Sequence, residues 1–314
     1  MANYNKHGLS RDIPEQVKRE VRQRCGFGCI ICGYAMCQYE HVDPKFHEAE
    51  EHIADCIVLL CATCHDSVTR GMLSKDTVKV KSKTPKCKEQ GFSFGAFDIG
   101  TTSPEIIIGT MKAKNAETFY INIYGDEIFS VQSPSILGQP FLISAKLCDR
   151  DGKEILRIKD NIWETSSANW DVEVIGSRII IRKKLGDIVL ALRSEPPDRL
   201  VVERLYMVYR GVQIRTKEDE DLEIETFIGQ IIKSPGIEFH NGKGGIEFTK
   251  DGAITMGSGG QGGTVMVKGG TTFKNGAPLE ETQSKKAKQE RNFPCSCGSG
   301  IKYKYCCGNK NKKI

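Results

Sequence analysis

The sequence predicts an α+β chain of several domains, with an N-terminal finger held by zinc, a central all-β domain and a small C-terminal zinc knuckle. Three observations lead to this fold class: two C-x-x-C pairs near the N-terminus, a long run of strand-like segments, and a crowd of cysteines at the C-terminus. With 314 residues, the chain has room for two or three domains. The boundaries that we expect are 1–85 for the finger, 86–115 for a linker, 116–270 for the β-rich domain, 271–291 for a flexible tether and 292–314 for the knuckle.

Composition limits the function classes. Hydrophobic residues make up 39% of the chain and charged residues 27%, and the net charge of +5 permits nucleic-acid binding without demonstrating it. The N-terminus lacks an apolar signal segment, and the longest apolar run, "CIVLLCA", is too short to span a bilayer. An odd total of 13 cysteines in clusters is typical of a reducing compartment. We therefore expect a soluble cytoplasmic protein with no membrane partner.

The first expected element is a helix in "IPEQVKREVRQRCG". Pro14 suits its first turn, Val17 and Val21 share one face, and Gly26 ends it. The other face is basic, and it is either a solvated surface or a set of phosphate contacts. The basic residues concerned are Lys18, Arg19, Arg22 and Arg24.

The two C-x-x-C pairs come next. Four thiolates from Cys29, Cys32, Cys61 and Cys64 can bind one tetrahedral zinc ion, and on their own they indicate only a structural zinc ribbon. The segment between the pairs contains more candidate metal ligands than a structural zinc ribbon requires. Glu40-His41 opens it, and His65 follows the last cysteine directly, so a carboxylate and two imidazoles could meet at a second, hydrolytic metal.

These residues resemble the HNH family of endonucleases, in the group whose ββα-metal finger is tied by two C-x-x-C knuckles. The matching stretches are "RDIPEQVKREVRQRCGFGCIICG", "YEHVDP" and "DCIVLLCATCH". The resemblance implies that Glu40 and His65 bind a catalytic Mg²⁺ or Mn²⁺ and that His41 is the general base. It also implies that the four cysteines bind a separate structural Zn²⁺ and that the substrate is DNA, in double-stranded form.

The chain departs from this family at one position. The residue that is commonly Asn there is Cys56, preceded by Asp55, and a thiol donates only weakly. Either Asp55 orients the histidine in its place, or activity is reduced. Asp43 is a further candidate metal ligand, because in a regular strand it shares a face with His41 while Glu40 faces away.

The string "HEAEEH" in the same segment resembles a metalloprotease motif. Its histidines, His47 and His52, are five residues apart, which places them about 140° apart around a helix. They cannot share a metal from one helix face, so we reject a protease and expect both side chains to be solvated.

The central domain is expected to be a β-sandwich or a β-barrel. Alternating segments such as "TFYINIYG", "FLISAKLCD" and "RIIIRKK" are separated by turn signals, and "LVVERLYMVYRGVQIR" is either two strands or a short helix. We expect Trp163 and Trp170 in the core. The "GIEF" unit occurs twice, nine residues apart, and fits short β rungs with glycine turns. His240 is expected at the surface or in a turn.

The C-terminal string "PCSCGSGIKYKYCCG" resembles the SEC-C motif, a zinc-binding tail. The resemblance implies that Cys295, Cys297, Cys306 and Cys307 bind a second structural Zn²⁺ and that the tail docks onto a partner. The lysines around it are either a solvated tail or a contact surface for nucleic acid or an acidic protein.

The function that we expect is a modular, divalent-metal-dependent DNA endonuclease, and by analogy alone its role is prokaryotic defence against phage or mobile DNA. The β-rich domain or the tail would contact a protein partner. The alternative is a non-catalytic zinc-containing adaptor that binds nucleic acid or protein. A third possibility is a finger that is silent until a ligand of the β-rich domain switches it on.

Overall fold

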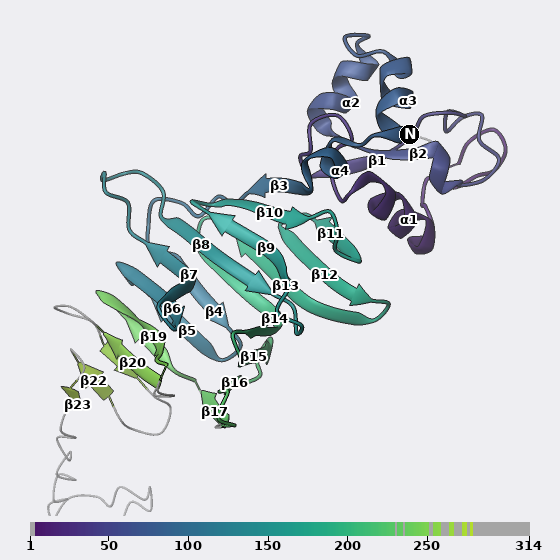
Figure 1. Cartoon of the computed structure of the whole chain (residues 1–314). Helices are drawn as coiled ribbons and strands as arrows, with labels where there is room; N and C mark the ends of the chain where they lie inside the picture. Colours follow the sequence, from purple (N-terminus) through teal and green to yellow (C-terminus); the bar gives the residue numbers. More distant parts are fainter. Residues whose placement is uncertain are drawn as a thin grey trace, which may run out of the picture. The chain divides into compact units, whose positions relative to one another are not determined.

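The computed structural model describes residues 4–229, 231–234, 236–250, 254–258, 264–266, 272–274 and 277–278 (Figure 1). By its internal contacts the chain divides after Ala277, and almost all described residues precede that point. The predicted tether and C-terminal knuckle lie outside the described residues, apart from two short strands at the beginning of the tether.

The finger contains most of the helices. The predicted first helix is confirmed: it follows Pro14 and ends at Gly26, whose φ of 74° is the left-handed conformation that ends many helices. Val21, Ile30 and Leu60 are fully buried in a small apolar core of this region. The elements are α1 (Glu15–Cys25), β1 (Cys37–His41), η1 (Ala54–Cys56), β2 (Ile57–Cys61), α2 (Ala62–Thr69), α3 (Lys75–Lys83) and α4 (Lys86–Gln90).

The rest of the described chain, the β domain, forms two sheets, drawn in Figure 1. The strand order of the first is β20-β19-β6-β7-β8-β9-β10-β3. Its strands are β3 (Phe92–Ala96), β6 (Thr118–Ile123), β7 (Asp126–Gln132), β8 (Leu142–Cys148), β9 (Glu154–Lys159), β10 (Ile162–Ser166), β19 (Lys243–Phe248) and β20 (Ile254–Ser258).

The second sheet runs β11-β12-β13-β14-β4-β5-β18-β21-β22-β23, and β14 also pairs with β15, which leads through β16 to β17. The ambiguous segment "LVVERLYMVYRGVQIR" thus forms two strands, β14 and β15. The strands are β4 (Glu105–Ile108), β5 (Met111–Lys114), β11 (Asp171–Ile175), β12 (Arg178–Lys184), β13 (Asp187–Glu195), β14 (Arg199–Tyr209), β15 (Val212–Lys217), β16 (Leu222–Glu225), β17 (Ile231–Ser234), β18 (Glu238–His240), β21 (Thr264–Met266), β22 (Thr272–Lys274) and β23 (Ala277–Pro278).

One apolar core joins the two sheets, so the domain is a sandwich. Ile143 of β8 and Leu190 of β13 are both fully buried in it. Trp163 is in the core as expected, at 1% exposure. The prediction for Trp170 is wrong: this residue is only half-buried, and the Arg19 guanidinium lies 5.3 Å from its ring centroid.

The prediction of a linker over residues 86–115 is wrong. Four elements, α4 and β3 to β5, form there, and Ile106, Ile108 and Met111 are buried in the sandwich core. Short strands such as "EIII" and "MKAK" carry little periodic signal, and their pairing with β14 and β18 is parallel and distant in sequence. Such pairing depends on tertiary contacts that a local pattern does not reveal.

The two "GIEF" units form strands of different sheets. The first contributes β18, which pairs in parallel with β5, and the second contributes β19, which pairs in parallel with β6. Phe239 and Phe248 point into the core at 2% and 1% exposure. His240, expected at the surface or in a turn, is a half-buried strand residue 2.8 Å from the Glu238 carboxylate.

Candidate functional site

The candidate site is built on two antiparallel strands followed directly by a helix. In the β1–β2 register, Cys37 faces Cys61 and Glu40 faces Val58, and α2 begins at the residue after β2 ends. Glu40 is therefore carried on β1 and His65 on α2. This order of elements is the one that the resemblance to HNH endonucleases implies, and membership of that family remains a prediction.

The four predicted zinc cysteines come together. The Sγ atoms of Cys29, Cys32, Cys61 and Cys64 all lie within 4.8 Å of one another, and the Cys32 and Cys61 sulfurs are 3.6 Å apart. Four sulfurs at the usual Zn–S distance would be about 3.8 Å apart in a tetrahedron. The cluster could therefore hold a zinc ion.

The acidity of these thiols also suits a metal cluster. A hydrogen bond from Cys37 lowers the pKa of Cys29 to about 4, whereas burial, followed by the nearby Cys29, raises the pKa of Cys32 to about 11. Several thiolates crowded in this way repel one another, and a bound cation relieves that repulsion. Cys61 also caps α2, because its sulfur accepts a hydrogen bond from the Cys64 N–H.

Glu40 and His65 meet beside this cluster. The Glu40 Oε2 lies 3.1 Å from the His65 Nε2, and both side chains are about one-third exposed, at 29% and 35%. Two adjacent ligands of an octahedral Mg²⁺ at its usual bond lengths are about 3.0 Å apart. A carboxylate oxygen and an imidazole nitrogen at this separation fit one divalent cation that solvent can reach.

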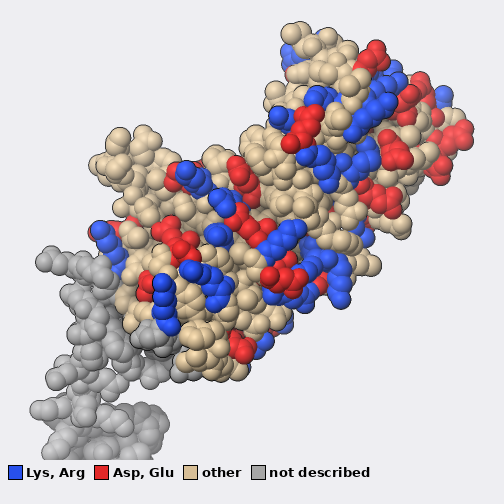
Figure 2. Space-filling model, viewed as in Figure 1, with Lys and Arg blue, Asp and Glu red and all other residues tan. Residues whose placement is uncertain are grey.

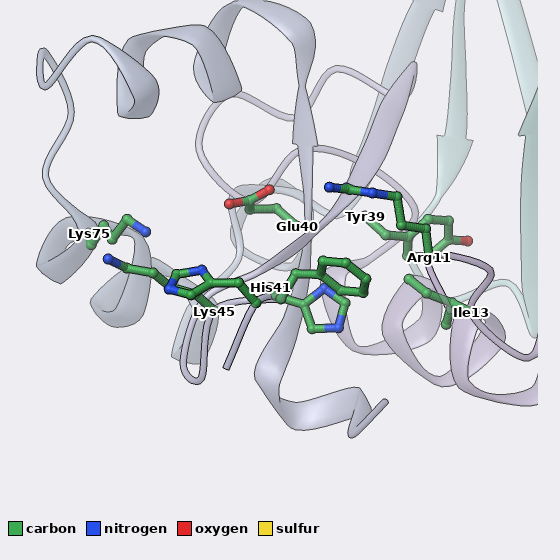
Figure 3. Close-up of a pocket in the computed structure, with 9 residues that line it drawn as sticks. Arg11, Ile13, Tyr39, Glu40, His41, Lys45 and Lys75 are labelled. Atoms are coloured by element: carbon green, nitrogen blue, oxygen red, sulfur yellow. The ribbon is translucent and has the colours of Figure 1, made fainter. Parts of the chain in front are cut away.

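His41 does not join this pair. It is the next residue along β1, so its ring leaves the opposite side of the strand from Glu40, and Figure 3 shows the two side chains diverging. The His41 Nε2 lies 3.2 Å from the His52 Nδ1, and the Phe46 ring packs edge-on at 5.4 Å. Burial, together with the neighbouring His52, lowers the pKa of His41 to about 4. The expected meeting of both imidazoles with one carboxylate is thus only half present.

The expectation that His52 is solvated is wrong. Its Nδ1 faces His41, and its Nε2 lies 2.9 Å from the Ser10 carbonyl oxygen. His47, by contrast, is 64% exposed as expected. His52 was missed because a loop of ten residues brings it back to His41, and the only sequence signal was the second histidine of "HEAEEH".

Three further predicted site residues contact other partners. The Asp43 carboxylate pairs with the Lys79 ammonium at 2.9 Å, which lowers the Asp43 pKa, and it does not approach Glu40 and His65. Asp55 is 88% exposed and lies 3.6 Å from the Arg24 Nε. Cys56 contributes its carbonyl, which accepts a hydrogen bond from the Val42 N–H. The side chain that lies within hydrogen-bond distance of the His41 Nε2 is that of His52.

The basic face of α1 is largely occupied within the molecule, which corrects the predicted phosphate contacts. Arg22 is buried and donates two hydrogen bonds to the fully buried Asp171, at 2.9 and 3.0 Å. Arg19 is 3.8 Å from the same carboxylate. Lys18 pairs with Glu15, and Arg24 donates to the Ala54 carbonyl.

Arg22 also reaches the site strand. Its Nη1 donates to the Tyr39 hydroxyl at 3.0 Å, and Tyr39 precedes Glu40 on β1. Because Asp171 is the first residue of β11, this arginine connects the β domain to the strand that carries Glu40 and His41.

A cavity of about 280 Å³ opens beside Glu40 and His41 (Figure 3). Glu40 is the one acidic residue among those that line it, whereas the cationic ones are Arg11, Lys45 and Lys75. Within the described residues, Lys45 and Lys75 make no ion pair. Sequence reasoning missed this basic rim, because its residues come from three separate segments. The lining consists of Arg11, Ile13, Tyr39, Glu40, His41, Lys45, Phe46, His47 and Lys75.

Comparison with known proteins identifies a motif near the C-terminus. A family model for the SEC-C motif matches residues 291–309, a span that contains Cys295, Cys297, Cys306 and Cys307. These residues lie outside the described part of the chain, and the motif indicates a second zinc site there. No curated protein and no solved structure matches the chain. Among the described helices, none is long and apolar enough to cross a membrane. The chain thus carries a SEC-C motif at its C-terminal end.

Proposed function

We propose that the protein is a divalent-metal-dependent endonuclease that hydrolyses DNA phosphodiester bonds. The observation that carries this proposal is the pair formed by Glu40 and His65, 3.1 Å apart and part-exposed. Glu40 lies on β1, which pairs with β2, and the four-cysteine cluster joins the end of β2 to α2, which carries His65. Glu40 also lines the cavity with the basic rim. A second carboxylate–imidazole pair, Glu238 with His240 at 2.8 Å, comes from a single strand and lies apart from the cysteine cluster.

Each group has a chemical task in this proposal. Glu40 and His65 would hold Mg²⁺ or Mn²⁺, which supplies polarisation of the scissile phosphate when bound. His41 accepts a proton from a water molecule in the cavity. The water oxygen attacks phosphorus, and the bond to the 3′ oxygen breaks, with that oxygen taking a proton from solvent. The four cysteines would bind zinc and keep β2 and α2 in place.

The basic rim supports nucleic acid as the substrate. Lys45 and Lys75 extend along one end of the cavity in Figure 3, and both are exposed and unpaired within the described structure. Figure 2 shows a group of Lys and Arg side chains on the finger, with Asp and Glu side chains along its outer edge, and the two kinds are also interspersed on the β domain. Unpaired ammonium groups beside the cation site can bind the phosphates that flank the cleaved bond.

The test is a nicking assay on supercoiled plasmid, with the full-length chain and Mg²⁺ or Mn²⁺. We expect wild type to nick the plasmid and Glu40→Gln or His41→Ala to lower the rate by about 10²-fold or more. The matched controls are Glu51→Gln and His7→Ala, which change exposed residues outside the cavity lining and should leave the rate unchanged. Equal rates in Glu40→Gln and Glu51→Gln would contradict the proposal.

A second candidate is favoured by the orientation of His41, which faces His52 instead of the Glu40–His65 pair. A finger built in this way could bind nucleic acid through Lys45 and Lys75 without cutting it. If wild type leaves the plasmid intact under every metal tried but still binds DNA, this adaptor function replaces the nuclease.

A further inference from the structure

His52, the second histidine of "HEAEEH", has no role in the proposed nuclease mechanism. Its ring lies between the His41 imidazole and a backbone carbonyl. Its Nδ1 is 3.2 Å from the His41 Nε2 and its Nε2 is 2.9 Å from the Ser10 oxygen. A carbonyl oxygen can only accept a hydrogen bond. The hydrogen of a neutral His52 must therefore lie on Nε2, which leaves Nδ1 as an acceptor.

This acceptor determines which nitrogen of His41 carries hydrogen. Because the His52 Nδ1 accepts, the His41 Nε2 must donate, and the His41 Nδ1 is the nitrogen that remains free to take a proton. The position of this hydrogen follows from the hydrogen-bonded series that runs from the Ser10 carbonyl through His52 to His41. The His41 Nε2 carries hydrogen in this series whether His41 is neutral or charged.

The surrounding packing keeps these rings in place. Phe46 contacts both of them, edge-on to His41 at 5.4 Å and stacked on His52 at 6.5 Å. The Arg11 guanidinium covers the Phe46 ring at 4.7 Å. The Asn5 side-chain amide donates to the carbonyls of Phe46 and Ala49, at 2.6 and 2.7 Å, and so ties the N-terminal segment to this loop.

We propose that His52 is a positioning residue for His41, which lines the cavity: His52 fixes the ring orientation and holds hydrogen on Nε2, so that Nδ1 is the nitrogen left to act as the base. The inference rests on the proposed nuclease function and deepens it. When water gives up its proton, the proton goes to the His41 Nδ1, Nε2 keeps its own hydrogen, and the His52 Nδ1 accepts from the imidazolium that results. Fixing the tautomer of a base in this way is worth large factors in rate.

Two variants of His52 distinguish the effect of its hydrogen bond to His41 from the effect of filling the same space. In His52→Asn the side-chain oxygen takes a place close to that of Nδ1 and can still accept from His41, whereas His52→Leu fills the space without an acceptor. We expect kcat for plasmid nicking to fall about 10- to 100-fold in His52→Leu with KM unchanged, and to recover most of the loss in His52→Asn. His7→Leu is the matched control, at an exposed histidine with no part in the site.

A second measurement does not depend on cleavage. Nitrogen-15 NMR of histidine side chains in the full-length protein, assigned with His41→Gln, reports which nitrogen carries hydrogen. We expect the His41 Nε2–H tautomer in wild type and in His52→Asn, and a mixture of tautomers in His52→Leu. A Nδ1–H tautomer in wild type, or equal kcat in His52→Leu and wild type, would overturn the inference. If wild type fails to nick, the nuclease proposal fails, and the NMR result still decides the role of His52.

Discussion

The finger and the β domain are stabilised in different ways. The finger buries a small set of apolar residues around Val21, Ile30 and Leu60, and its four-cysteine cluster and ion pairs supply the remaining constraints. The β domain buries a large core between two sheets. A region of about 80 residues rarely gains more than about 3–5 kcal/mol from its core alone. The difference teaches that the candidate site lies in the region with the smaller core, where a four-cysteine cluster and a buried ion pair to the β domain add contacts.

Loss of zinc is the change that should separate the two regions most. Structural zinc contributes about 10–16 kcal/mol of binding free energy in finger peptides. We expect Cys29→Ser with Cys61→Ser to unfold the finger and leave the β domain folded. Hydrogen exchange measured by mass spectrometry should show fast exchange in α1 and β2 and unchanged protection in β8 and β13.

Cys56→Ser is the control for that experiment, because Cys56 lies in the finger but outside the cluster. It should keep both the zinc content and the protection pattern. Continued protection of the finger in the double cysteine variant would show that its core is sufficient without metal and would break the comparison.

The buried ion pair tests whether the finger depends on the β domain. Asp171→Ala leaves the Arg22 charge without its main partner, so we expect the finger to lose about 3–5 kcal/mol. Urea unfolding followed by Trp170 fluorescence is a suitable measurement, because Trp170 is the residue next to Asp171.

An apolar replacement of the whole pair serves as the control. Arg22→Met combined with Asp171→Leu removes both charges, and we expect part of the lost stability to return. The return is partial because Asp171 also pairs with Arg182 at 3.0 Å and lies 3.8 Å from Arg19. If the single and double variants are equally destabilised, packing at this contact matters more than charge.

A matched pair of conservative substitutions compares the two cores directly. Ile30 and Ile143 are both fully buried, one in each region. Ile→Val at either position should cost about 0.5–1.5 kcal/mol. Because the finger is smaller, the same cost should lower its Tm by roughly 4–8 °C per kcal/mol, against about 2–4 °C for the β domain. Calorimetry that finds one shared transition would show that the two regions unfold as a unit.

The smallest expected effect concerns which lysines bind DNA. Lys45→Ala and Lys75→Ala should each weaken binding a few-fold and reduce the slope of log K against log salt by about 0.9. Lys18→Ala should change neither, because Lys18 is paired with Glu15. Fluorescence anisotropy with Glu40→Gln, in the absence of divalent metal, measures binding without cleavage. A larger effect at Lys18 would restore the original assignment of the phosphate contacts.

Local pattern was sufficient for several features of the fold. The limits of α1 follow from Pro14 and Gly26, and the alternating segments of the β domain become strands such as β8 and β12, because caps, turns and period-2 burial act within a few residues. The spacing of the C-x-x-C pairs correctly predicted the four-cysteine cluster. The pairing of Glu40 with His65 is also local, since β1 pairs with β2 and α2, which carries His65, begins at the next residue.

Other features depend on partners far away in the sequence. Arg22 looks like a solvated helix residue until Asp171, 149 positions later, is brought against it. The strands between residues 92 and 114 acquire their identity from β10, β14 and β18. His52 reaches His41 only because the loop folds back over Phe46. In each case the stabilising contact forms with a residue that is distant in sequence and comes close only when the whole chain packs. A local sequence pattern therefore cannot identify that residue.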